Sequence, residues 1–302
     1  QWDSIIPIAQ CVIAEEKINS MMKEIQSYFK DCDAFDVRKH HGTFRYAVIR
    51  STPLDSSVSF VLNSDSQKLH DAIEKIKLFA EQCSAKNILV TCVPAQSDVS
   101  TSSDYFVIKG NDFLQTSLWG KKFVYPIQGF FQNNHRMAEK MQSYVSQLLE
   151  KYETKNAMLL DLYGGVGTFG IVNADLFKEV LIIESVKESI EAAKKNIEQN
   201  ACAHVNTLVL DAKHIARVSC KKPFFVITDP PRVGMDQKTM SFLNNEKPEC
   251  IIYISCNPQQ LAKDILKFRN YSLKSLALFD LFPQTPHGEA IVELVLYDRE
   301  KY

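Results

Sequence analysis

The sequence predicts an α/β protein, with a parallel, doubly wound sheet over residues 126–302 and a smaller α+β domain in front of it over residues 1–125. In the second part, runs of β-branched and apolar residues alternate with helix-like segments, as in parallel strands joined by helices. The first part lacks this alternation and places short strand candidates beside two amphipathic segments. A length of 302 residues is enough for two buried cores.

Two helices and several strands are expected in the first domain. Apolar residues recur at helical spacing over residues 15–30, and a second amphipathic helix is expected over residues 65–82. Strands are expected at residues 43–51, 57–64, 86–93, 105–110 and 121–127. We expect these strands to pair in antiparallel fashion.

The second domain is expected to open with a long helix over residues 134–152. Further helices are expected over residues 186–200 and 258–268, between strands at 157–165, 179–185, 206–212, 224–231 and 250–258. The last two strand candidates, 271–280 and 290–298, have no clear helix between them. We therefore expect an antiparallel addition at the edge of the sheet.

The composition is that of an ordinary globular protein, with 45% hydrophobic and 24% charged residues. No apolar run is long enough to span a bilayer and no secretory signal is visible, so we expect a cytoplasmic monomer without a membrane partner. None of the eight cysteines forms a C-x-x-C pair, which argues against a self-contained zinc site and favours reduced thiols. The chain begins at Gln1 rather than Met, and we expect a fragment that lacks its N-terminal region.

One local stretch is basic although the formal net charge is −1. Residues 37–50 interleave aromatic side chains with Arg38, Lys39, His40, His41, Arg45 and Arg50. This pattern suits phosphate contacts combined with base stacking. A solvated turn followed by a strand explains the composition equally well.

A glycine-rich turn follows the first strand of the second domain, in "DLYGGVGTFG", with glycines at 164, 165, 167 and 170. Glycines between a strand and a helix allow tight turning and close approach to a ligand. Glu184 ends the next strand, twenty residues after Gly164, where it can accept hydrogen bonds from ribose hydroxyls. Asp211 ends the following strand. Both NAD and S-adenosylmethionine fit this arrangement.

The motif "TDPPR", residues 228–232, separates these two cofactors. It resembles the motif with which methyltransferases of the class I fold hold a planar base. Two consecutive prolines give the loop a rigid, extended backbone. No marker of a nicotinamide slot is present, so S-adenosylmethionine is the expected cofactor.

Cys256 stands where the strand "IIYIS" ends, just before Asn257 and Pro258. The carboxyl ends of strands in open α/β sheets are where ligands and active groups gather. A buried free cysteine that acts as a small hydrophobe is the alternative interpretation.

Five motifs occur together in the order and approximate spacing of one family: "FFQNN", "DLYGGVGTFG", "TDPPR", "YISCNP" and "LFPQTPHGE". In these motifs the chain resembles the RNA uracil-5-methyltransferases, which make 5-methyluridine in tRNA and in 23S ribosomal RNA. The resemblance implies a class I (Rossmann-like) methyltransferase domain that uses S-adenosyl-L-methionine. Residues 38–50 look like the family's central domain, which implies that the first domain contacts RNA.

The resemblance also implies roles for single residues. Cys256 matches the family's nucleophile, which adds to C6 of uracil so that C5 can attack the methyl group, and Glu289 matches the base that removes the C5 proton. His287 is a second candidate base, although a loop-shaping role is the preferred interpretation. The implied cofactor contacts are Gln132, Tyr163, Gly164, Gly165, Gly167, Thr168, Glu184, Asp211 and Asp229, and the implied substrate contacts are Phe130, Asp229 and Arg232. Gly165 departs from the family, since many relatives carry Cys or Ser there.

Two other functions are alternatives to uracil-5 methylation. RNA cytosine-5 methylation also uses a cysteine, but "SCNP" and "HGE" argue against it. A non-catalytic RNA-binding protein with a methyltransferase fold would not need both Cys256 and Glu289.

Many members of the family carry a 4Fe-4S cluster held by four cysteines. Cys11, in "QCVIA", resembles the fourth of them, with its partners upstream of Gln1. We therefore expect no cluster and no metal in this 302-residue chain, and an iron–sulfur cluster only in the full-length protein.

Overall fold

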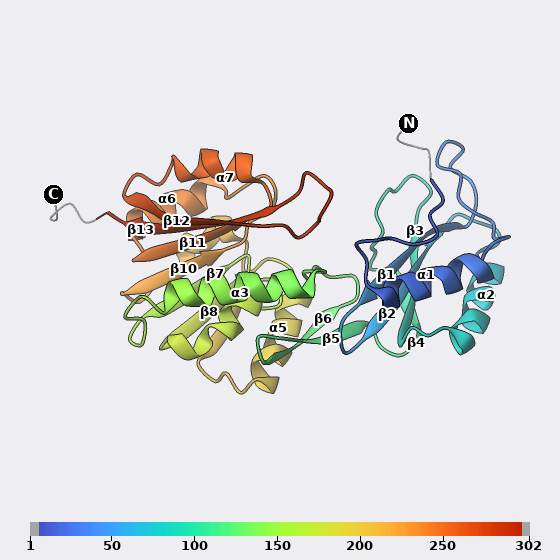
Figure 1. Cartoon of the computed structure of the whole chain (residues 1–302), viewed down its shortest axis with the longest axis horizontal. Coiled ribbons are helices and arrows are strands. Elements are labelled where there is room, and N and C mark those ends of the chain that lie inside the picture. The colour runs from blue at the N-terminus through green and yellow to red at the C-terminus, as the bar shows by residue number, and fades with distance from the viewer. Residues whose placement is uncertain (1–5, 298–302) are drawn as a thin grey trace. The chain divides into compact units, whose positions relative to one another are not determined.

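The protein is described by a computed structural model that covers residues 6–297 (Figure 1). It divides into two compact units. The first unit comprises the described residues up to Thr116 together with Pro126–Gly129. The second unit comprises Ser117–Tyr125 and the described residues from Phe130 onward. No helix within residues 6–297 is both long and apolar enough to cross a membrane.

The first unit is a four-stranded sheet with the order β1-β2-β3-β4 and two helices. Its elements are α1 (Glu16–Tyr28), β1 (Phe44–Ser51), β2 (Ser56–Asn63), α2 (Leu69–Gln82), β3 (Asn87–Val93) and β4 (Tyr105–Lys109). Both helices pack on the sheet through one apolar core, where the rings of Phe29, Phe60 and Phe79 meet with centroids 5.0–5.8 Å apart. Burial of these aromatic faces holds α1 and α2 to the sheet.

The expectation of antiparallel pairing throughout this sheet was wrong for one pair. Strands β2 and β3 run parallel, whereas β1–β2 and β3–β4 are antiparallel. Helix α2 lies between β2 and β3 in the chain, and such a crossover returns the chain to the edge where β2 began.

A separate two-stranded sheet consists of β5 (Phe113–Leu118) and β6 (Lys121–Pro126). The sequence analysis predicted β6 but not β5. The two strands are joined by Trp119 and Gly120, which both have positive φ, 51° and 74°. This is the backbone of a two-residue hairpin turn that Asn-Gly usually forms, so Trp-Gly gave no turn signal.

The second unit is built on a seven-stranded sheet with the order β12-β13-β11-β10-β7-β8-β9. The strands are β7 (Met158–Leu162), β8 (Glu179–Glu184), β9 (Val205–Val209), β10 (Phe224–Thr228), β11 (Cys250–Ser255), β12 (Tyr271–Phe279) and β13 (Glu289–Leu296). Strands β7 to β11 are parallel, and β13 runs antiparallel to both β11 and β12. The predicted α/β fold with a doubly wound sheet and an antiparallel edge is confirmed.

Helices cover the two faces of this sheet (Figure 1). They are α3 (His135–Leu149), α4 (Thr168–Val172), α5 (Lys187–Gln199), α6 (Gln237–Glu246) and α7 (Pro258–Ile265), with short 3₁₀ segments η1 (Ala174–Leu176) and η2 (Ala212–Arg217). Helix α6, which the sequence analysis did not single out, begins after Asp236, whose carboxylate accepts from the backbone N–H groups of Lys238 and Thr239. Apolar side chains of α6 and α7 share a core with β7, β10 and β11.

The strand order fixes where a site can form. From β7 the chain winds outward to β8 and β9, then returns to β10 on the other side of β7 and winds to β11. The loops after β7 and β10 therefore diverge, and the crevice between them lies at the carboxyl edge of the sheet. Ligands of open α/β sheets bind at such a switch point.

Candidate active site

A pocket lies at this switch point in the second unit and holds about 580 Å³ of empty space, part of it open to solvent. The pocket brings together many of the residues singled out from the sequence: Phe130, Gln132, Tyr163, Gly164, Gly165, Thr168 and Asp229. Most of its remaining lining is apolar and comes from β5, α3 and α4.

The floor of the pocket is the glycine-rich turn between β7 and α4. A Cβ atom at Gly164 would lie 2.7 Å from the Ile182 side chain, and one at Gly167 would lie 2.8 Å from it. A larger residue at either position would force the Ile182 side chain to move, and Gly167 also has a φ of 85°, which favours glycine. The turn therefore packs tightly on the sheet below and presents its backbone to the pocket above.

Two carboxylates hold this turn in place. Glu184, the last residue of β8, accepts from the Gly165 backbone N–H (3.1 Å). Asp161 is buried in β7 and accepts from the Gly170 N–H at 2.8 Å. Burial raises the pKa of the Asp161 carboxyl to about 7, and the charge of Glu184 adds to the rise. The sequence analysis did not assign Asp161, because an acid inside a buried strand gives no sign of its partner.

Asp211 stands apart from the pocket lining. It lies at the start of η2, accepts from the Lys213 backbone N–H and forms an ion pair of 2.6 Å with the Lys213 ammonium group. These contacts lower the pKa of Asp211. Its charge also contributes to the raised pKa of Tyr163.

Cys256 and Glu289 are brought together by strand register. Strands β11 and β13 pair antiparallel with Ser255 opposite Ala290, and the next step along this register sets Cys256 opposite Glu289. The Glu289 carboxyl is largely buried at the first position of β13. A thiol and a carboxyl that are distant in sequence thus become neighbours.

Four side chains near this point, Cys256, Glu289, Asp229 and Arg232, influence one another's pKa values. Burial raises the pKa of the Cys256 thiol, the carboxylates of Glu289 and Asp229 raise it further, and a hydrogen bond and the charge of Arg232 lower it. Burial also raises the pKa of Glu289, against the opposing charge of Arg232. The pKa of Asp229 lies well above its usual range because the group is buried, with Glu289 and Asp161 nearby.

The groups around Cys256 affect how readily its thiol ionises. A half-buried thiol lies beside carboxyl groups that hold protons more tightly than usual, and a guanidinium favours the thiolate. Cys256 can therefore act as a nucleophile and Glu289 as a proton acceptor or donor. His287 lies in the exposed loop before β13, where its backbone N–H donates to Thr285 Oγ1.

Two asparagines in the motifs tie the loops of the site together. Asn257 caps α7 by accepting from the Gln260 N–H (3.2 Å), and its Nδ2 donates to the Arg232 carbonyl (3.0 Å). Asn134 caps α3 and donates from Nδ2 to the Leu281 carbonyl (3.1 Å). The sequence analysis gave neither a role, although an Asn just before a helical run is a capping signal.

The two phenylalanines of "FFQNN" differ in exposure, since Phe131 is buried and Phe130 is exposed. Phe131 is buried and stacks on Tyr125 with ring centroids 4.2 Å apart and planes 9° apart. Phe130 is 76% exposed at the pocket. The buried ring anchors the segment, which leaves Phe130 and Gln132 free to meet a ligand.

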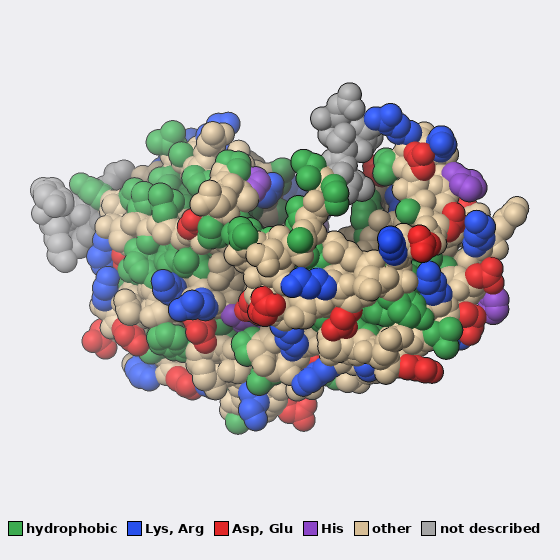
Figure 2. Space-filling view, turned by 45° about the vertical axis from the view of Figure 1, so that its right-hand side comes forward, with side chains coloured by type: hydrophobic (Ala, Val, Ile, Leu, Met, Phe, Trp, Pro, Cys, Tyr) green, Lys and Arg blue, Asp and Glu red, His purple; other side chains and the backbone are tan. Residues whose placement is uncertain are grey.

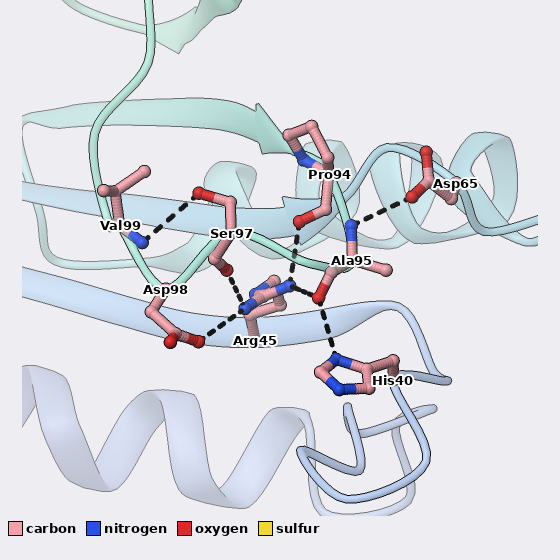
Figure 3. Close-up of polar contacts among 8 residues, drawn as sticks. All are labelled: His40, Arg45, Asp65, Pro94, Ala95, Ser97, Asp98 and Val99. Atoms are coloured by element: carbon pink, nitrogen blue, oxygen red, sulfur yellow. Dashed lines mark hydrogen bonds and ion pairs between the residues drawn. The ribbon is translucent and has the colours of Figure 1, made fainter.

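In the first unit, one arginine of the basic stretch has a structural role. Arg45 donates to the carbonyls of Pro94, Ala95 and Ser97, and its side chain is only 2% exposed (Figure 3). The guanidinium also lies 4.1 Å from the centroid of Phe35. Arg45 thus anchors the loop after β3, and its guanidinium is engaged in contacts within the unit.

Other members of the stretch also have contacts or lie at the surface. The His40 ring lies 3.2 Å from the Ala95 carbonyl through Nδ1, and Arg50 donates to the Gly129 carbonyl at 2.6 Å. Arg38, Lys39 and His41 are exposed. On the face shown in Figure 2, basic and acidic side chains are interspersed and form no single basic patch.

Cys11, the proposed cluster ligand of a longer protein, is half-buried in the first unit. Its backbone N–H donates to the Asn19 side chain (2.8 Å), and its carbonyl accepts from the same side chain (3.0 Å). Among the described residues, no group of three or more His, Cys, Asp or Glu side chains is placed to hold a metal ion.

Residues 2–296 match the family model of the tRNA (uracil-5-)-methyltransferases. A protein of Nanoarchaeum equitans described as an uncharacterized RNA methyltransferase is 33% identical over 97% of this chain. The tRNA (uracil(54)-C(5))-methyltransferase of Pyrococcus horikoshii is 30% identical over 98% of this chain and 69% of its own length. The chain spans 65% and 64% of the first two curated relatives that it matches.

The chain also resembles a solved structure over nearly its whole length. That structure is the Pyrococcus abyssi tRNA (uracil-54, C5)-methyltransferase in complex with S-adenosyl-L-homocysteine. The TM-score is 0.77 at 27% sequence identity, over 98% of this chain and 71% of that one.

Proposed function

Because the chain belongs to the tRNA (uracil-5-)-methyltransferase family, we propose that it transfers the methyl group of S-adenosyl-L-methionine to C5 of a uridine in RNA. The observation that carries the proposal is the position of Cys256 and Glu289, one residue beyond the last pair of β11 and β13 at the carboxyl edge of the sheet, with Asp229 of the glycine-floored pocket nearby. The cluster supplies a nucleophile and a proton acceptor on the same side of the sheet as the pocket.

The cofactor would lie in the pocket of the second unit, and the residues present fit it. The tight glycine turn leaves backbone exposed above the sheet, and Glu184 and Asp211 offer carboxylates at successive strand ends. Gln132, Tyr163 and Thr168 line or border the methionine side of the same cavity in this proposal. The bound sulfonium supplies an electrophilic methyl group.

The Cys256 thiolate adds to C6 of the uracil ring, and the C5–C6 double bond becomes an enolate delocalised to O4. The C5 carbon would then take the methyl group, while the electron pair of the broken S–C bond stays on sulfur and S-adenosyl-L-homocysteine is the leaving group. Glu289 removes the C5 proton, the C5–C6 double bond re-forms, and the C6–S bond breaks to release 5-methyluridine. A free thiol is only a few per cent ionised near neutral pH, so Arg232 has the role of favouring the thiolate.

Burial of the Glu289 carboxyl helps it to remove the C5 proton. A carboxylate in water is a weak base, and the raised pKa of Glu289 makes it a stronger proton acceptor near neutral pH. Asp229 and Arg232 would orient the uracil edge, and the exposed ring of Phe130 would stack on a base.

Uridine in tRNA is the first substrate to test, since the Pyrococcus horikoshii relative is named for position 54 of tRNA. Ribosomal RNA of the large subunit is the second. RNA carrying 5-fluorouridine at the target should form a covalent adduct with the protein in the presence of S-adenosyl-L-methionine, because fluorine at C5 cannot be removed as a proton. The adduct should map to Cys256 by peptide mass spectrometry. A catalytically active preparation that gives no adduct would exclude this mechanism.

A further inference from the structure

The loops that carry Cys256 and Arg232 meet through helix α7. Cys256 precedes the helix, and Asn257, its N-cap, donates to the Arg232 carbonyl at 3.0 Å. This bond fixes one point of the Arg232 loop. A second and more buried attachment lies seven residues further along, at Asp264.

Asp264 is fully buried and accepts hydrogen bonds on both carboxylate oxygens. Its Oδ2 accepts from the Tyr253 hydroxyl at 2.7 Å and from the Met235 backbone N–H at 3.2 Å. Its Oδ1 accepts from the Gln260 amide at 3.0 Å and from the Lys267 ammonium group at 2.9 Å. Burial of a carboxylate is costly unless such donors surround it.

These contacts connect three parts of the active site. Tyr253 is in β11, three residues before Cys256, and its hydroxyl also accepts from the Met235 N–H (3.1 Å). Met235 ends the loop that begins at Asp229 and contains Arg232. A single carboxylate thus joins the strand that leads to Cys256, the helix that follows it and the loop of Arg232.

The loop lies so close to the carboxylate that only glycine fits. Gly234 has a φ of 84°, and a Cβ atom there would come within 2.3 Å of Asp264 Oδ2 and 2.8 Å of the Gln260 side chain. The backbone of the loop is therefore seated directly on the buried side chain.

We propose that Asp264 is a positioning residue of the methyl transfer: it fixes the Arg232 loop against β11 and α7 and thereby keeps the Arg232 guanidinium at the Cys256 thiol. The inference rests on the proposed function, because Arg232 matters to catalysis only if Cys256 is the nucleophile. Asp264 itself lies beneath the loop and acts through Arg232.

Loss of the Asp264 contacts should raise the pKa of the Cys256 thiol. The groups that face the Cys256 thiol are Glu289 and Asp229, which raise its pKa, and Arg232, which lowers it. If the loop around Arg232 moves away from α7, the lowering contribution weakens. Glu289 stays in place on β13, and Asp229, which directly follows β10, stays tied to β7 because its backbone N–H donates to the Leu162 carbonyl (3.3 Å). The thiol should then ionise at higher pH.

The test uses Asp264→Asn, which preserves shape but removes the charge and one acceptor oxygen. Alkylation of Cys256 by iodoacetamide is followed across pH by peptide mass spectrometry, which distinguishes this thiol from the other cysteines. We expect the midpoint of the profile to move upward by about half to one pH unit. Adduct formation with 5-fluorouridine RNA should slow about tenfold.

The matched control is Glu293→Gln. Glu293 lies further along β13 and is also a fully buried carboxylate. It accepts hydrogen bonds from the hydroxyl groups of Tyr152 and Ser275. This control should change neither the alkylation profile nor the adduct rate. Binding of S-adenosyl-L-homocysteine by calorimetry reports whether each variant is folded. If Asp264→Asn does not fold, Tyr253→Phe removes one partner of the same anchor and should shift both readouts in the same direction.

A double-mutant cycle separates positioning from general structural support. In the Arg232→Gln background, Asp264→Asn should have little further effect on the alkylation profile, because the group it positions is already absent. Equal effects in both backgrounds, a parental profile in Asp264→Asn, or an equal shift in Glu293→Gln would overturn the inference. Failure of the parent protein to form any adduct would count against the proposed function instead, and the alkylation profiles would still decide the role of Asp264.

Discussion

Cys256 and Glu289 lie one register step beyond the last pair of β11 and β13, and the proposed mechanism gives them different steps. Cys256→Ala should lower RNA methylation at least about a thousandfold, because the ring can no longer be activated at C6. Binding of S-adenosyl-L-homocysteine should be unchanged, since the thiol attacks the base. Methyl transfer from labelled cofactor and calorimetry measure the two effects. Near-normal turnover in this variant would exclude Cys256 as the nucleophile.

Glu289→Gln should stop the reaction at a later step than Cys256→Ala, after methyl transfer and before release of the RNA. The amide keeps the shape of the side chain but cannot accept the C5 proton, so addition and methyl transfer proceed while release fails. We expect a methylated protein–RNA adduct to accumulate and to be visible on a denaturing gel with unmodified RNA. Normal turnover would transfer the role of base to another group, and His287→Ala in the same assay tests the nearest candidate in the sequence.

Asp161 should make the stability of the protein depend on pH. Its pKa is raised from 3.8 to about 7 in the folded protein, so the folded state holds a proton that the unfolded chain releases. The folding free energy that this group contributes is therefore most favourable below pH 4 and is lost between pH 4 and 7, by roughly 2–4 kcal/mol.

Urea unfolding at pH 5 and pH 8 measures this effect. The parent protein should lose more stability over that interval than Asp161→Asn, which has no proton to release and can still accept from the Gly170 N–H. The same loss in both proteins would show that other groups dominate the pH dependence.

At the scale of the elements, Arg45 holds the loop that follows β3 through three carbonyls and the ring of Phe35. Arg45→Gln should destabilise the first unit by about 2–3 kcal/mol, because the carbonyls lose a charged donor and the buried space is left poorly filled. Thermolysin should then cut this loop faster near Val99, which is 52% exposed. Gel electrophoresis and mass spectrometry of the fragments follow the cleavage.

The matched control is Lys39→Gln, which removes the same charge from a side chain that is 80% exposed in the same basic stretch. It should change stability by less than about 0.5 kcal/mol and leave the cleavage rate unchanged. Equal cleavage in the two variants would mean that net charge, rather than the anchoring contacts of Arg45, controls the loop.

Local patterns predicted most elements, because apolar periodicity and turn residues are local signals. The strands around the glycine turn, Thr228 and Cys256 were predicted for this reason. Features that depend on long-range geometry were missed or misread. The composition around Arg45 left a phosphate contact and a structural position equally open, and Asp264 gave no signal, since its partners lie up to 29 residues away.

At the scale of the whole molecule, alternating strands and helices predicted the doubly wound sheet and thus the edge at which the site forms. The pattern could not predict that β2 and β3 would pair in parallel, because short strands carry little information about their neighbours. Nor could it join Cys256 to Glu289, which are 33 positions apart and meet only through the register of β11 and β13. The resemblance of several motifs to one family made that connection before the structure did.

The division into two units leads to a prediction about where cofactor binding acts. Every pocket residue lies in the second unit, and the glycine turn is held there by Asp161 and Glu184. S-adenosyl-L-homocysteine should therefore slow amide hydrogen exchange in the glycine turn of residues 161–170 and in residues 130–134, because a bound ligand suppresses local opening. Strands β2 and β3 of the first unit should exchange at the same rate with and without it. Mass spectrometry of peptic fragments measures both regions, with Glu184→Gln as a variant expected to weaken protection. Protection in β2 and β3, or none in the glycine turn, would contradict a cofactor site confined to the second unit.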